Sequence, residues 1–191
     1  MAVSRTKFGA FWAVAIAALI LVGCDEETTN QSTDTGNGET TTETVTLPQK
    51  VNEPMVYWLE DTGEAFELVA TPMPATKENP KETLAQLMTE LMETKPDGDR
   101  ASALPENTKV ISQKIQGDEI FINLSVDFTE GGGSASMIGR LGQVIYTATS
   151  IDPEAAVWLQ VEGEPLELLG GEGLVIAQPM TRTIFEQEFE L

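Results

Sequence analysis

Residues 119–150 show two hydrophobic periods in series, one typical of a strand and one typical of a helix. Apolar residues recur at every second position of 119–128, which predicts a strand with one buried face. After the glycines at 131–133, apolar residues recur at helical spacing, which predicts a helix that begins at Ser134 as N-cap. Because each element has one apolar side, the two must bury those sides against each other or against neighbours.

The flanking segments carry further strand and helix signals. Asn79, Pro80 and Glu82 form a helix start with an N-cap, a proline at the first position and a capping-box acid, and Lys95-Pro96 closes this helix. The further expected strands are residues 55–59, 66–70, 109–115, 157–161 and 166–169. The order β-β-α-β-β-α-β-β predicts an α+β fold, a single compact domain with two helices packed on a small mixed sheet.

The N-terminal residues predict export and lipid attachment. Arg5 and Lys7 precede an apolar run that is too short for a comfortable membrane span. The run ends in Leu21-Val22-Gly23-Cys24, which resembles the lipobox of bacterial lipoproteins. Residues 1–23 are therefore interpreted as a signal peptide, and Cys24 as the lipidated first residue of a protein anchored at the extracytoplasmic face of the cell membrane. Whether this is the inner or the outer membrane is left open.

The rest of the chain divides by composition. Residues 24–52 are rich in Thr and acidic side chains and poor in apolar ones, which predicts a disordered tether. Residues 53–182 hold the predicted strands and helices and form the expected folded domain. Residues 183–191 form a C-terminal tail for which the pattern indicates no clear partner.

Charge and composition exclude several functions. The formal net charge of −20 argues against binding nucleic acid, because such a surface repels phosphate backbones. The chain has no His, so the commonest general base and zinc ligand is missing. Its single cysteine allows no intramolecular disulfide. We expect no metal and no cofactor.

Catalytic motifs are weak or missing. Gly131–Gly133 lack the lysine of a phosphate-binding loop and the spacing of a dinucleotide fingerprint. No G-x-S-x-G or S-x-x-K pattern supplies a nucleophile. The acidic pairs Asp97/Asp99 and Asp118/Glu119 fall in predicted turns, where a solvated surface is the simpler account. We therefore expect no enzymatic activity.

The second predicted helix carries a strip of small residues beside its apolar face. The strip consists of Ala135, Gly139, Gly142 and Tyr146. Two glycines inside a helix cost about 1 kcal/mol each relative to alanine, so a close contact should compensate. Two interpretations stay open. The strip is a contact surface for a partner, or it packs within the domain, against the first helix or the loop after it.

From Val56 to Arg182 the chain resembles the GerMN domain, named after the spore-germination and sporulation lipoprotein GerM. The order of the matching segments carries the resemblance, since no segment is specific alone. Leu104–Val110 stands in the place of the family's "IPxGTKV". The other segments are Val56-Tyr57-Trp58-Leu59, Asn123–Phe128, Gly132-Gly133-Ser134, Arg140-Leu141 through Gln143 to Tyr146-Thr147, Val161–Pro165, and Pro179-Met180-Thr181-Arg182.

The resemblance implies a non-catalytic α/β module, somewhat similar to the ring-building modules of envelope-spanning complexes. The chain departs from the family in having Lys95-Pro96 where Gly-Pro is usual, and in carrying one copy where GerM has two. The leading hypothesis is a lipid-anchored, non-enzymatic cell-envelope protein whose domain is a protein-interaction or assembly module, with an envelope protein or a second copy as partner. The alternative is an extracytoplasmic small-ligand binder or a carboxylate-dependent cell-wall hydrolase.

Overall fold

The computed structural model describes residues 53–74, 79–171 and 173–191. The expected signal peptide, its motif Leu21-Val22-Gly23, the lipidation site Cys24 and the tether 24–52 lie outside the described residues. Within the described part of the chain, no helix has the length and hydropathy that a membrane span needs.

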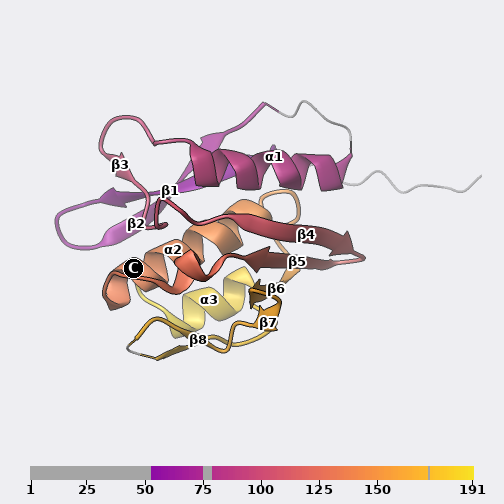
Figure 1. Ribbon diagram of the computed structural model, residues 1–191. Coiled ribbons are helices and arrows are strands. Elements are labelled where there is room, and N and C mark those ends of the chain that lie inside the picture. The colour runs from indigo at the N-terminus through magenta and orange to yellow at the C-terminus, as the bar shows by residue number, and fades with distance from the viewer. Residues whose placement is uncertain (1–52, 75–78, 172) are drawn as a thin grey trace, which may run out of the picture. The chain divides into compact units, whose positions relative to one another are not determined.

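The described residues form an α+β domain with three α-helices and nine short or medium strands (Figure 1). The strands are β1 (Met55–Asp61), β2 (Phe66–Pro72), β3 (Arg100–Ala101), β4 (Val110–Gln116), β5 (Glu119–Leu124), β6 (Ala156–Val161), β7 (Glu164–Pro165), β8 (Leu168–Leu169) and β9 (Leu174–Val175). The helices are α1 (Pro80–Glu93), α2 (Ser134–Ala148) and α3 (Arg182–Glu188). The predicted fold class is confirmed, although the strands divide among three sheets and a third helix is present.

The first sheet has the strand order β2-β1-β3. β1 and β2 form the expected hairpin in a regular register from Met55↔Pro72 to Asp61↔Phe66. β3 lies in the segment between α1 and β4, for which the sequence predicts no strand, and it pairs with the end of β1. Along the edge of β1 that β3 does not reach, α2 takes the place of a strand. Thr147 Oγ1 accepts from Tyr57 N at 3.0 Å, and Gln143 Nε2 donates to Tyr57 O at 3.2 Å.

The second sheet has the order β4-β5-β6-β7, with β5 and β6 parallel and joined through α2. The strand predicted across 119–128 ends at Leu124, and residues Val126–Thr129 form a 3-10 helix instead. The pairing partner β6 ends at Val161, and the side chain of Glu162 accepts from Val126 N at 3.0 Å, so the ladder stops there. The chain then turns, which buries Phe128 and leaves Val126 exposed.

The prediction of the last hairpin is wrong for its second strand, residues 166–169. β6 turns at Glu162-Gly163 and pairs with β7, while β8 pairs with β9 in a separate two-stranded sheet. Beyond Pro165 the side chain of Gln178 interrupts the β6–β7 ladder, because its amide accepts from Leu159 N and donates to the carbonyls of Leu159 and Leu166. Leu169 packs in the core from β8, whereas Leu168 and Val175 face solvent.

The segment expected to be a tail is mostly helical. Thr181 caps α3, since its hydroxyl accepts from Ile184 N at 3.2 Å. Phe185 is buried against α2 beside Gly142, so α3 is part of the folded domain. With seven residues, α3 is too short to show a clear helical period in the sequence.

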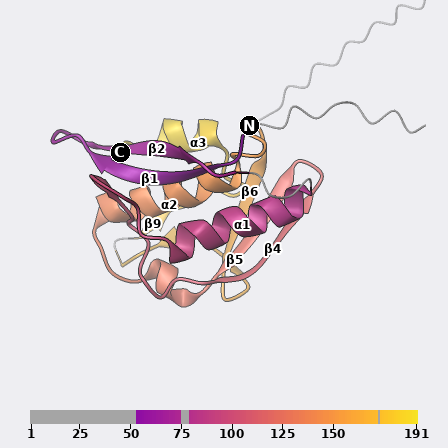
Figure 2. The ribbon, with the colours of Figure 1, turned by 90° about the horizontal axis from the view of Figure 1, so that it is seen from above.

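The core lies where α1 and α2 pack on each other and on both larger sheets. Asn79 caps α1 as expected, with its side chain accepting from Lys81 N. In Figure 2, α1 runs beside the β1–β2 hairpin. The most deeply buried apolar side chains include Leu87, Met88, Ile122, Leu124, Phe128, Leu141, Val144, Ile145 and Val157.

Candidate functional site

An open cleft of about 930 Å³ runs between the C-terminal half of α1 and the segment that links α1 to β4. Leu91 and Met88 of α1 form part of its wall and are themselves buried in the core. Met92, Leu104 and Val110 are partly buried and complete an apolar floor. A volume of this size is typical of ligand pockets, which are mostly apolar with a few placed polar groups.

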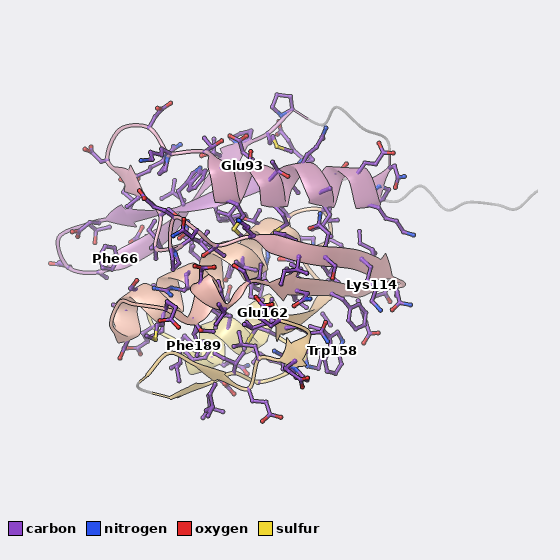
Figure 3. All side chains as sticks on the ribbon, in the orientation of Figure 1. Phe66, Glu93, Lys114, Trp158, Glu162 and Phe189 are labelled. Atoms are coloured by element: carbon purple, nitrogen blue, oxygen red, sulfur yellow. The ribbon has the colours of Figure 1, made fainter. Side chains whose placement is uncertain are left out.

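Charged side chains surround the apolar floor. Figure 3 labels Glu93, at the end of α1 where the cleft lies. Lys95 and Glu106 form an ion pair of 3.6 Å across the rim, with both side chains almost fully exposed. Arg100 donates from Nη1 to Thr71 Oγ1 at 2.7 Å, and Lys109 is exposed at the opposite side of the linking segment. An exposed pair of this kind contributes little stability.

Thr108 is the buried polar residue of the cleft wall. Its backbone N–H donates to Pro105 O at 3.0 Å and closes a turn. Its side chain is only 5% exposed, and its hydroxyl oxygen has no hydrogen-bond partner in the structure. A buried hydroxyl without a partner is unfavourable, and because this oxygen is closed to solvent it does not face the open cleft.

The glycine loop at the start of α2 is held from inside by Arg140. The guanidinium donates to the carbonyls of Phe128, Glu130 and Gly131 at 2.8 to 2.9 Å and to Ser136 Oγ at 3.2 Å. Burial lowers the pKa of Arg140 from its ordinary value, and the side chain is 2% exposed. These contacts give the loop a structural role, as the missing phosphate-loop lysine also indicates.

The strip of small residues on α2 faces other parts of the same domain at its two glycines. Gly139 and Gly142 are buried, whereas Ala135 is exposed. A Cβ placed on Gly139 would lie 2.7 Å from Leu59 Cδ1, and one on Gly142 would lie 2.8 Å from Phe185 Cζ. These glycines therefore admit β1 and α3, and Gly139 also meets Ala103 in the segment after α1, where the sequence suggested a neighbour.

Tyr146, the fourth residue of the strip, attaches α3 to α2. Its hydroxyl donates to Glu186 Oε1 at 2.6 Å, and its ring packs edge-on against Phe185. The guanidinium of Arg182 lies 4.6 Å from the Tyr146 ring centroid and donates to Tyr146 O. Burial, and then the bond to Glu186, raise the pKa of Tyr146 well above its usual range.

The acidic pairs considered for catalysis are not among the residues that line the cleft. Asp97 and Asp99 are exposed in the segment before β3, and Asp118 is exposed in the β4–β5 turn. Glu119 accepts a hydrogen bond from Trp158 Nε1 at 2.9 Å. Among the described residues, no group of three or more acidic, His or Cys side chains is placed to hold a metal ion.

A row of stacked side chains crosses the solvent face of the second sheet, and the sequence did not reveal it. Lys114 Nζ lies 4.3 Å from the Phe121 ring centroid, and the Phe121 and Trp158 rings are nearly parallel with centroids 6.1 Å apart. Figure 3 labels Lys114 and Trp158, which lie at the same side of the molecule. The rings cover one another's faces, so the row stabilises the sheet more than it offers a flat platform.

The cleft was also missed, although a signal for it exists in the sequence. Lys95, Arg100 and Lys109 fall close together in a chain with 31 acidic and 11 basic residues. Most of the segments that carry the family resemblance serve the interior instead. Arg140 holds the glycine loop, and Gln143 bridges β1 to Ala103 N. Leu104–Val110 is the segment that lines the cleft throughout its length.

These elements define an α+β domain of the GerMN type, with a cleft beside its first helix. The family model of Germane, described as "Sporulation and spore germination", matches residues 55–167. The chain belongs to this family. A search among curated proteins finds no match.

Two solved structures share the fold. The first GerMN domain of the sporulation protein GerM from Bacillus subtilis is 21% identical, with a TM-score of 0.51 over 69% of this chain and 98% of that chain. The tandem GerMN domains of the same protein are 22% identical, with a TM-score of 0.50 over 67% of this chain and 46% of that chain. At this identity the likeness establishes the fold alone.

Proposed function

We propose that this protein is a lipid-anchored, non-enzymatic module of the cell envelope that binds another protein or a second copy of itself. The observation that carries the proposal is the open cleft beside α1, with an apolar floor and a charged rim. Such a combination is typical of a recognition site, in which apolar contacts supply affinity and a few polar groups fix orientation.

The chemistry of the cleft favours binding over catalysis. Thr108 would need a neighbouring base to act as a nucleophile, and its hydroxyl has no partner. Glu106 is paired with Lys95 and its side chain is 87% exposed. A catalytic acid of a glycosidase needs an environment that favours its protonated form, which solvent and a lysine oppose. The described geometry therefore supports the binding role better than a carboxylate-dependent hydrolase.

The anchor rests on the sequence at Cys24. Acyl chains contribute about 0.8 kcal/mol per buried methylene, so several chains on one N-terminus hold a protein at a membrane. We expect Cys24→Ala to leave the detergent-requiring membrane fraction, either as an uncleaved precursor or as soluble protein. An intact mass that shows an unmodified Cys24 in a full-length, membrane-bound chain would end this part of the proposal.

Site-specific photo-crosslinking in intact cells tests the binding role. A photoreactive residue at Asn107, which is exposed at the cleft, should crosslink to a specific protein or to a second copy. The control position is Glu64, exposed in the β1–β2 turn and outside the cleft lining, where we expect no such product. Equal products from both positions, or none from Asn107, would contradict a partner-binding cleft.

A further inference from the structure

The groups that line the cleft match a carboxylate with an apolar neighbour, and we infer that the cleft binds an extended acidic peptide segment of the partner. This inference rests on the proposed function, because it names the chemistry of the segment that the same cleft receives. The polar groups in question are Arg100 and Lys109, and the apolar ones are Met92 and Leu104.

Positive charge gathers at the cleft in an otherwise acidic chain. The described residues include seven Lys or Arg side chains, which are Lys81, Lys95, Arg100, Lys109, Lys114, Arg140 and Arg182. Three of them line the cleft. Arg140 and Arg182 are engaged elsewhere, with backbone carbonyls and tyrosine rings. With a net charge of −20 over the whole chain, an anionic group finds its most favourable described surface here.

Two of the three cations retain donors for a ligand. Lys95 is already paired with Glu106 across the rim. Arg100 uses Nη1 for Thr71 Oγ1, but a guanidinium carries five N–H donors in a planar fork that suits a carboxylate. Lys109 is exposed at the cleft. A carboxylate between Arg100 and Lys109 would accept from both.

The acidic rim distinguishes a peptide from a phosphate-bearing ligand. Glu93 and Glu106 also line the cleft, and both would repel the double charge of a phosphate. A peptide carries single carboxylates and offers backbone N–H groups, which the two rim carboxylates can accept. The flexible side chain of Met92 on the floor adapts to apolar residues of different shapes. The cleft thus fits an acidic residue flanked by leucine-like side chains.

Selection from a library of random 12-residue peptides on the purified full-length protein tests the inference. We expect the enriched peptides to carry Asp or Glu beside Leu, Met or Phe. Their affinity should fall roughly ten- to a hundredfold with Lys109→Gln and with Arg100→Gln, as for the loss of a charged hydrogen bond. Lys81→Gln is the matched control: it removes one exposed positive charge from α1 outside the cleft, and affinity should stay unchanged.

The melting temperature separates a ligand contact from a structural one. Lys109→Gln changes an exposed side chain and should leave the melting temperature unchanged, whereas Arg100→Gln also removes the bond to Thr71 and is compared at equal folded fraction. Failure to enrich peptides, enrichment of basic peptides, or unchanged affinity with Lys109→Gln and Arg100→Gln would overturn the inference. A crosslink from Asn107 to a basic partner segment would overturn it while the proposed function stands. If acidic peptides are enriched but Asn107 gives no crosslink in cells, the acidic-peptide preference stands and the proposed function is contradicted.

Discussion

Replacement of Arg140 by methionine tests how a buried cation holds the glycine loop without an acidic partner. The methionine keeps much of the apolar stem and removes every donor of the guanidinium. Three carbonyls, those of Phe128, Glu130 and Gly131, then lose a hydrogen bond from a charged group. The loop that leads into α2 loses its internal support.

The three lost bonds do not cost the same. The bond to Phe128 O is buried, so its loss leaves an acceptor without water and costs about 1–3 kcal/mol. The carbonyls of Glu130 and Gly131 are partly exposed, and water can replace much of each bond, at about 1 kcal/mol each. The substitution also removes a desolvated charge whose Nε has no partner, which offsets part of the loss. We expect Arg140→Met to lower the free energy of unfolding by about 2–4 kcal/mol.

Urea denaturation at neutral pH measures this difference. Lys81→Met, which removes an exposed charge from α1, should change the free energy of unfolding by less than about 0.5 kcal/mol. Arg140→Lys should fall between wild type and Arg140→Met, because an ammonium lacks the planar fork that reaches several carbonyls at once. An Arg140→Met protein within about 0.5 kcal/mol of wild type would refute the reasoning, since the carbonyls would then need no guanidinium.

Two further predictions concern the contact between α2 and α3. Gly142→Ala should lower stability by about 1–2 kcal/mol in thermal or urea unfolding, because the new Cβ would meet the Phe185 ring at 2.8 Å and the overpacking outweighs the gain in helix propensity. Ala135→Leu, exposed on the same helix, should be nearly neutral, and a stabilised Gly142→Ala protein would contradict the tight packing. For Tyr146 the folded pKa lies above the unfolded value, so the folded state holds its proton after the unfolded state has lost it, and stability falls as pH rises above about 10. Tyr146→Phe should make that fall shallower in unfolding measured from pH 9 to 11, and equal slopes for both proteins would show that Tyr146 does not carry it.

The sequence predicts best the elements whose pattern is local. Asn79 and Pro80 define the start of α1 by their own chemistry, and the alternation from Ile120 to Leu124 matches β5. The α+β class and the family follow from such elements in order. The strand from 119 was predicted four residues too long, because its end depends on where β6 stops and on a carboxylate from Glu162.

The candidate site was harder to predict because its contacts join distant parts of the chain. The spacing of Gly139 and Gly142 indicates close packing, but their neighbours Leu59, Leu68 and Phe185 come from three other elements. Likewise, the sequence gives Thr108 no feature that distinguishes it from other loop residues. Only the structure shows that its buried oxygen has no hydrogen-bond partner. A pattern of residue types reports that a contact is needed, and only the fold determines which residue makes it.

The two side chains of α2 that bond to Tyr57 also bear on how the protein avoids aggregation. An uncovered strand edge offers a row of N–H and C=O groups with which another chain can pair. Thr147 and Gln143 occupy both groups of Tyr57, and Gln143 also accepts from Ala103 N at 2.8 Å. The helix therefore closes to foreign strands the part of β1 that β3 is too short to cover. Protection against misassembly at this edge comes from an amide and a hydroxyl inside the domain, and it does not depend on the acidic surface.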